Sequence, residues 1–158
     1  IRKLSDNLLR GGYIFEDLFL FKFHPPVNYL YRTRIFEEIG YFNPSIYAED
    51  YHMNLKIASR YPIGFIDEYL GYYRVDNRVE KVPRFLKVSE SHLQTIEEYK
   101  EHPLYTKAKL IVYLRISFVF SVYKNEKRNA LTYLFKAIPI FYHPRFLYTC
   151  IRLLFVWK

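Results

Sequence analysis

The sequence predicts an α+β or partial α/β chain, with a few short strands in the first half and a mostly helical second half. In the first half, short segments rich in Tyr, Ile and Val lie between Pro and Gly residues and alternate with helical patterns. In the second half, apolar residues recur only at helical spacing. We therefore expect two regions, residues 1–80 and residues 81–158.

The elements of the first half follow from local periodicity and from the residues that start and stop helices. Thr33 is a suitable N-cap for a helix that Gly40 would end. Tyr51, Leu55 and Ala58 share one helical face, which predicts a buried stripe. We expect helices at 3–9, 13–21, 33–39 and 48–60, strands at 27–31, 63–66 and 69–75, and a loop at 41–47.

The second half is expected to contain four helices, at residues 84–100, 104–124, 127–138 and 144–157. Val88, His92, Ile96 and Tyr99 would form the buried face of the first.

Composition restricts the class of protein. The chain has 158 residues, of which 51% are hydrophobic and 5 are Gly, and this excludes a disordered or low-complexity chain. Cys150 is the single cysteine, so an internal disulfide is excluded. No apolar run reaches the roughly 18 residues of a membrane span.

The net charge of +8 belongs entirely to the second half, because acids and bases balance over residues 1–79. From His102 onward there are ten Lys and Arg residues and one acid, Glu126. Such asymmetry points to an anionic partner. No nucleic-acid recognition motif is present, so nucleic acid is not the expected partner.

The last expected helix has a polar and an apolar face. Arg145, Thr149 and Arg152 share one face, and the other carries Leu147, Ile151 and Leu154, with Phe155 and Trp157 beside them. An interfacial helix on an anionic membrane has this arrangement. Alternatively, these helices pack on each other and the Lys and Arg side chains are merely solvated. Both interpretations remain open on the sequence.

One spaced series of motifs extends over residues 27–78. It comprises Phe36-Glu37-Glu38-Ile39-Gly40-Tyr41-Phe42-Asn43-Pro44, Tyr47-Ala48-Glu49-Asp50-Tyr51, Leu55-Lys56-Ile57-Ala58, Ile63-Gly64-Phe65-Ile66 and Tyr72-Tyr73-Arg74. The series resembles the acceptor-side half of family-2 glycosyltransferases, enzymes of the GT-A fold that build bacterial surface polysaccharides. The resemblance implies the C-terminal portion of a GT-A fold in the first region and an inverting transfer of sugar from a nucleotide-sugar donor to a saccharide or lipid-linked acceptor.

The resemblance also assigns residues. Asp50 would be the catalytic base that removes the proton of the acceptor hydroxyl, and Glu49 would bind an acceptor hydroxyl. Arg74 would contact the donor diphosphate, although Asp76 stands where the family often has His and cannot donate a proton as His does. The other interpretation is that Glu49 and Asp50 are first-turn acids stabilised by the helix dipole. A second acidic pair, Glu16-Asp17, is expected on the solvated side of its helix.

The metal-binding Asp-x-Asp motif of these enzymes does not occur in the sequence. The five histidines are scattered and there is no metal-ligand spacing, so no metal or other cofactor is expected on this segment. The resemblance places a divalent Mg or Mn ion in a donor-binding half outside it. By this interpretation the chain is a fragment that is inactive alone.

Two hypotheses from different classes follow. The first is the acceptor-binding part of a glycosyltransferase, cytoplasmic and peripheral to the inner face of the cell membrane. The alternative is a non-catalytic helical module that binds a membrane or a protein, in which Glu49 and Asp50 are structural.

Overall fold

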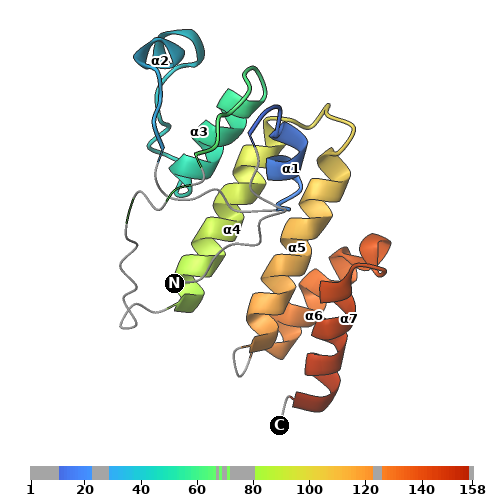
Figure 1. Ribbon diagram of the computed structural model, residues 1–158. Coiled ribbons are helices and arrows are strands. Elements are labelled where there is room, and N and C mark those ends of the chain that lie inside the picture. Colours follow the sequence, from blue (N-terminus) through green and yellow to red (C-terminus); the bar gives the residue numbers. More distant parts are fainter. Residues whose placement is uncertain are drawn as a thin grey trace. The chain divides into compact units, whose positions relative to one another are not determined.

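The structure is a computed structural model that describes residues 11–22, 29–66, 68, 71, 81–122 and 126–156. The chain forms two compact units, Ile1–Val79 and Glu80–Lys158 (Figure 1). The division lies one residue from the expected boundary between residues 80 and 81. The described residues are mostly helical.

The first unit contains three described helices, α1 (Phe15–Phe19), α2 (Thr33–Ile39) and α3 (Glu49–Ala58). All three were predicted, although α1 and α3 are shorter than expected. The expected helix at residues 3–9 lies outside the described residues. Gly40 ends α2 as predicted, with a positive φ of 84°. The predicted N-cap is wrong by one residue. Thr33 is the first residue of α2, and the N-cap is Arg32, whose side chain makes no capping hydrogen bond.

The strand predictions are wrong for the residues that the structure describes. Residues 29–31 and 63–66 form no strand, and residues 27–28, 69–70 and 72–75 lie outside the description. Within the described ranges the β-type pairing is one antiparallel bridge, in which Gly12 N–H donates to Ile63 O at 2.7 Å and Ile63 N–H donates to Gly12 O at 2.9 Å. Aromatic and β-branched residues favour half-buried, packed surfaces of any kind. Among the described residues of the first unit, that surface is formed by helices and not by a sheet.

One core cluster of the first unit lies between α2 and α3. Ile39, Met53 and Ile57 are buried there. Partly buried side chains surround them: Tyr31, Ile35, Phe36, Tyr61 and Ile63. The expected stripe on α3 is only part of its buried surface, because Met53 and Asn54 are buried as well as Leu55 and Ala58.

Helix α1 also packs on α3. Leu18 and Phe19 are fully buried, the Tyr51 hydroxyl lies 3.5 Å from the Leu18 carbonyl oxygen, and the rings of Phe21 and Tyr51 stack at 5.1 Å. Asp17 is buried and pairs with Lys22 at 2.7 Å. The expectation that Asp17 is solvated is therefore wrong.

The second unit is helical, as predicted. Its described elements are α4 (Lys81–Glu97), α5 (Tyr105–Val122), α6 (Lys127–Lys136), the 3₁₀ turn η1 (Ile138–Ile140), α7 (Pro144–Ile151) and the π-helical turn η2 (Arg152–Val156). The expected helix at 127–138 ends at Lys136. Pro139 lies in the following 3₁₀ turn, and its ring nitrogen cannot donate the next helical hydrogen bond.

Helix α5 is the centre of the second unit, with α4 alongside it and α6 and α7 against it (Figure 1). His92 and Ile96 of the expected α4 face are buried, and Val88 and Tyr99 are partly buried. The fully buried Ala130 allows α6 to approach α5 closely, and Ser117 Oγ donates to its carbonyl oxygen at 2.7 Å. None of the described helices is both long enough and apolar enough to cross a membrane.

The glycine pair at the β-bridge gives a test of the first unit. A Cβ on Gly11 would lie 2.9 Å from Ile63 O and 3.2 Å from Phe65 N, and Gly12 has a φ of 109°. Gly11→Ala and Gly12→Ala should each lower the free energy of unfolding by about 1–3 kcal/mol, through a backbone clash and through strain respectively. Urea unfolding followed by circular dichroism measures this.

Gly64→Ala is the matched control. A Cβ there meets nothing within 4 Å, so the substitution should leave stability unchanged or raise it slightly. Equal effects of Gly11→Ala and Gly64→Ala would contradict the described packing.

A second test concerns the start of α7, which depends on the charge of His143. Its Nδ1 accepts the Arg145 N–H at 3.2 Å, which requires the neutral imidazole. Burial, and then the charges of Arg145 and Lys107, lower the pKa of His143 below its usual value near 6.5. The unfolded state therefore takes up a proton first, and stability should fall as the pH drops from about 6.5 to the folded pKa.

Thermal unfolding of His143→Asn across this pH range isolates the contribution of His143, because the Asn side chain accepts at every pH. We expect a weaker dependence on pH than in the unsubstituted protein. His143→Ala should cost about 1 kcal/mol at neutral pH through loss of the cap. Identical pH profiles for the Asn variant and the unsubstituted protein would show that this cap does not control α7.

Candidate functional site

Glu49 and Asp50 are exposed in the first turn of α3. The chain immediately before them is anchored by the buried Ile46 and Ala48, and the helix after them is buried from His52 onward. The Asp50 carboxylate accepts the backbone N–H of Tyr51 at 2.7 Å. The two acids therefore lie at the solvent-facing end of an otherwise buried helix.

The loop before α3 is held by a tight turn. Asn43 Oδ1 accepts the N–H of Ser45 at 3.0 Å, and its carbonyl oxygen accepts the N–H of Ile46 at 3.2 Å. Aromatic side chains of this loop remain in solvent: Tyr41 is 73% exposed and Tyr47 is 50% exposed. The loop is thus fixed in the backbone and presents aromatic rings outward.

Four rings beside this loop contact one another, and we call them the aromatic wall: Tyr31, Phe36, Tyr41 and Phe42. Phe36 and Tyr41 stack with nearly parallel planes at 5.7 Å, and Tyr31 meets Phe42 edge-on at 6.2 Å. Aromatic rings give a large, rigid apolar surface, and Tyr adds a polar end.

The aromatic wall continues into a polar cluster. Tyr29 and Tyr31 stack at 5.7 Å, and the Tyr31 hydroxyl donates to Asn54 Oδ1 at 3.1 Å. Burial, followed by the negative charge of Asp50, raises the pKa of both phenols, that of Tyr31 to about 12. Both hydroxyls stay protonated at neutral pH. Because the Tyr31 hydroxyl donates its hydrogen to Asn54, its oxygen can still accept a further hydrogen bond.

Asn54 lies one helical turn after Asp50 and is buried. Its Oδ1 receives the Tyr31 hydroxyl, and its amide lowers the pKa of Tyr29 in opposition to burial. The amide nitrogen itself has no hydrogen bond of normal geometry with any described residue. Asn54 therefore positions the Tyr31 hydroxyl.

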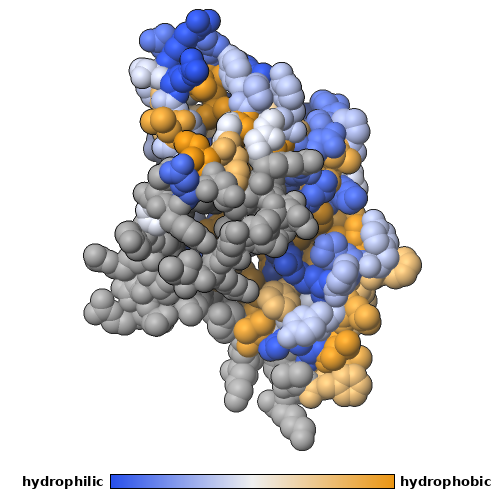
Figure 2. Space-filling model, in the orientation of Figure 1, coloured by the Kyte–Doolittle hydropathy of each residue, from blue (hydrophilic) through white to orange (hydrophobic). Residues whose placement is uncertain are grey.

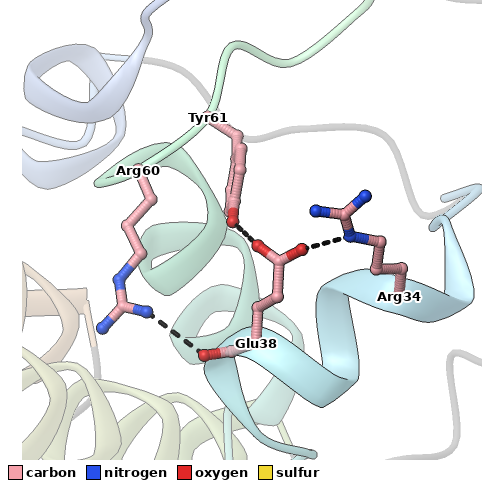
Figure 3. A network of polar contacts seen from close by, with 4 residues as sticks. All are labelled: Arg34, Glu38, Arg60 and Tyr61. Carbon is pink, nitrogen blue, oxygen red and sulfur yellow. Dashed lines mark hydrogen bonds and ion pairs between the residues drawn. The ribbon is translucent and has the colours of Figure 1, made fainter.

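A second polar network joins α2 to the residues after α3 (Figure 3). The Glu38 carboxylate accepts from Arg34 Nε at 2.6 Å and from the Tyr61 hydroxyl, and Arg60 donates to the Glu38 carbonyl oxygen at 3.3 Å. The hydrogen bond from Tyr61, and then that from Arg34, lower the pKa of Glu38. Exposed pairs of this kind stabilise little, but they link the two helices that flank the loop.

The structure places two of the three predicted site residues. Glu49 and Asp50 are adjacent and exposed, whereas Arg74 lies outside the described residues. Across the described ranges, no group of three or more His, Cys, Asp and Glu side chains could hold a metal ion.

Sequence reasoning missed Tyr29, Tyr31 and Asn54. Two signals could have found them. Tyr29 and Tyr31 are two residues apart, which puts both side chains on one side of an extended segment. Asn54 follows Asp50 at i+4, which puts both on one helical face.

The chain matches no protein-family model, no curated protein and no solved structure. The resemblance to family-2 glycosyltransferases therefore depends on the spaced residues alone.

The contact between Tyr31 and Asn54 can be tested by a double-mutant cycle. Tyr31→Phe leaves the buried Asn54 Oδ1 without its donor and should cost about 1–3 kcal/mol. Asn54→Leu removes the acceptor. The double variant should lose less than the sum of the two, with a coupling energy of about 0.5–3 kcal/mol measured by urea unfolding.

Tyr41→Phe is the control, because the Tyr41 ring is largely exposed and its substitution should change stability by less than about 0.5 kcal/mol. Additive losses in the cycle would mean that the 3.1 Å contact contributes nothing.

Proposed function

We propose that the chain is the acceptor-side, C-terminal portion of a GT-A inverting glycosyltransferase of surface polysaccharide synthesis. The observation that carries the proposal is the exposed carboxylate of Asp50 in the first turn of α3, one helical turn before the buried Asn54 that binds the Tyr31 hydroxyl. The motif series of residues 36–74 supports the same assignment.

In this proposal Asp50 is the general base. It accepts the proton of an acceptor hydroxyl while the hydroxyl oxygen attacks the anomeric carbon of the donor. The bond from that carbon to the nucleoside diphosphate breaks, and the diphosphate leaves with its electron pair. Because Asp50 is accessible and its helix is anchored by buried residues, its direction is fixed before the acceptor arrives.

The acceptor is a saccharide or a lipid-linked saccharide. Its hydroxyls would bind Glu49 and the hydroxyls of Tyr29 and Tyr31, and a sugar ring would lie on the exposed rings of Tyr41 or Tyr47. Rigid aromatic surface next to a few polar groups is typical of small-molecule sites.

The remaining assignments extend beyond the described residues. Arg74 would contact the donor diphosphate, and the donor-binding half with its Mg or Mn ion would lie outside this chain. The enzyme would work in the cytoplasm, at the inner face of the cell membrane. The chain alone would then be inactive.

Asp50→Asn tests the role of the base, assayed in the protein together with its donor-binding half. It should lower kcat about 10²- to 10⁴-fold, because the amide cannot accept the proton, while the circular dichroism spectrum stays unchanged. Glu49→Gln should raise the acceptor KM more than it lowers kcat. Radiolabelled sugar transfer under saturating donor measures both.

Glu16→Gln is the matched control, since Glu16 is an exposed acid in the first turn of another helix. It should leave transfer unchanged. Near-normal activity of Asp50→Asn would remove Asp50 as the base.

The alternative function, a helical module that binds a membrane or a protein, has its own support in the exposed apolar side chains of the second unit. In this alternative the chain is not catalytic, and Glu49 and Asp50 are structural acids of the first turn of α3. The Asp50→Asn assay therefore decides between the two functions.

A further inference from the structure

The outer face of α7 and η2 is apolar and exposed. Leu147 and Leu154 are 63% and 75% exposed, and Phe155 is 75% exposed. These residues, with Tyr148 and Ile151, follow the spacing of a single helical face, and we call the five side chains the apolar face. An exposed row of large apolar side chains marks an interaction surface.

The orientation of this face is fixed by packing on the opposite side of the helix. Thr149 and Leu153 are buried, and the Arg145 guanidinium lies over the ring of Phe118 of α5 at 5.9 Å. Tyr148 stands at the edge of the apolar face: it is half exposed and its ring also meets that of Phe118, at 5.8 Å. The apolar face therefore points outward because α7 is docked on α5 by its other face.

This packing revises the two faces expected from the sequence. Thr149, expected on the headgroup-facing polar side, is fully buried, and Arg152 is only partly exposed, with its guanidinium over the ring of Tyr148 at 5.9 Å. The basic residues that could reach an anionic surface must therefore come from elsewhere as well.

Neighbouring elements extend the apolar surface. Phe141 and Tyr142, in the turn before α7, are 68% and 67% exposed. In Figure 2, apolar residues gather over α7 and the segment that precedes it, at the lower right of the view. Aromatic residues prefer the boundary between lipid and water, where the ring is apolar and the hydroxyl of Tyr remains hydrated.

The charges of the second unit indicate which kind of partner the apolar face binds. Lys127, Arg128 and Lys136 are exposed, and Glu126, the one acid after His102, is hydrogen-bonded to Asn129 at 2.6 Å. An apolar groove on another protein would match the apolar face without any need for this excess of positive charge. An anionic membrane matches both features, because its interface accepts apolar side chains beneath negative headgroups.

We infer that the apolar face binds the surface of an anionic bilayer, with α7 and η2 lying in the plane of the headgroups. The apolar side chains enter the acyl boundary, and exposed Lys and Arg residues meet the lipid phosphates. This inference does not rest on the proposed sugar transfer.

The test is vesicle binding by the full chain. Vesicles of phosphatidylcholine alone are compared with vesicles of equal parts phosphatidylcholine and phosphatidylglycerol, by sedimentation and by the emission of Trp157, the one tryptophan of the sequence. We expect binding to the anionic vesicles with a blue shift of the emission, and binding that weakens at least tenfold on neutral vesicles or in 0.5 M salt.

Two variants separate the apolar from the electrostatic contribution. Leu147→Ser with Leu154→Ser should weaken binding at least tenfold at low salt, since both side chains lose apolar area. Lys127→Gln with Arg128→Gln should weaken binding to anionic vesicles severalfold and leave the weak binding to neutral vesicles unchanged.

Leu30→Ser is the control, because Leu30 is 98% exposed and lies in the first unit. Equal binding of Leu30→Ser and the Leu147/Leu154 variant would overturn the inference. The absence of binding to anionic vesicles would also overturn it. A third contrary outcome is self-association, measured by sedimentation velocity, that the Leu147/Leu154 variant abolishes although this variant still binds vesicles. None of these three results bears on Asp50, whose assay is sugar transfer.

Discussion

The burial of α3 is the constraint on which the first unit depends. Met53 and Leu55 are inaccessible to solvent, and α1 and α2 both pack against this helix. Moving α3 would expose large apolar side chains, each worth about 1.5–3 kcal/mol of burial. Because the helix cannot move, the acids of its first turn are held at a fixed place in solvent, and the loop before them is held between buried anchors.

The same constraint explains the polar cluster next to Asp50. Asn54 is buried among apolar residues, where an amide is tolerated only with hydrogen-bond partners, and Tyr31 supplies one. A core that retains such a group gives up some stability. In the first unit this loss of stability occurs beside the exposed carboxylate of Asp50 and the aromatic wall. Local departures from the most stable arrangement are expected at functional sites.

Much of the secondary structure could be predicted from the sequence, since α3, α4 and α7 follow an apolar periodicity and α2 ends at the stop signal Gly40. The strands at 29–31 and 63–66 could not, because strand formation depends on a neighbouring strand that local sequence does not reveal. Of the site, Glu49 and Asp50 could be named from their motif. The contact of Tyr31 with Asn54 could not, since it depends on how residues more than twenty positions apart pack.

The sequence by itself determined the division of charge, the helical second half and the acidic pair at the start of a helix. These are properties of composition and of near neighbours along the chain. Only the tertiary structure decided which face of α7 is buried: the Thr149 side, with Arg145 and Arg152 over aromatic rings, lies against α5, and the row from Leu147 to Phe155 faces solvent. Hydropathy alone predicts that the apolar row is the buried face. The face that is buried is instead the one that fits the neighbouring helix. Aromatic rings can cover the hydroxyl of a threonine and the apolar stem of an arginine there.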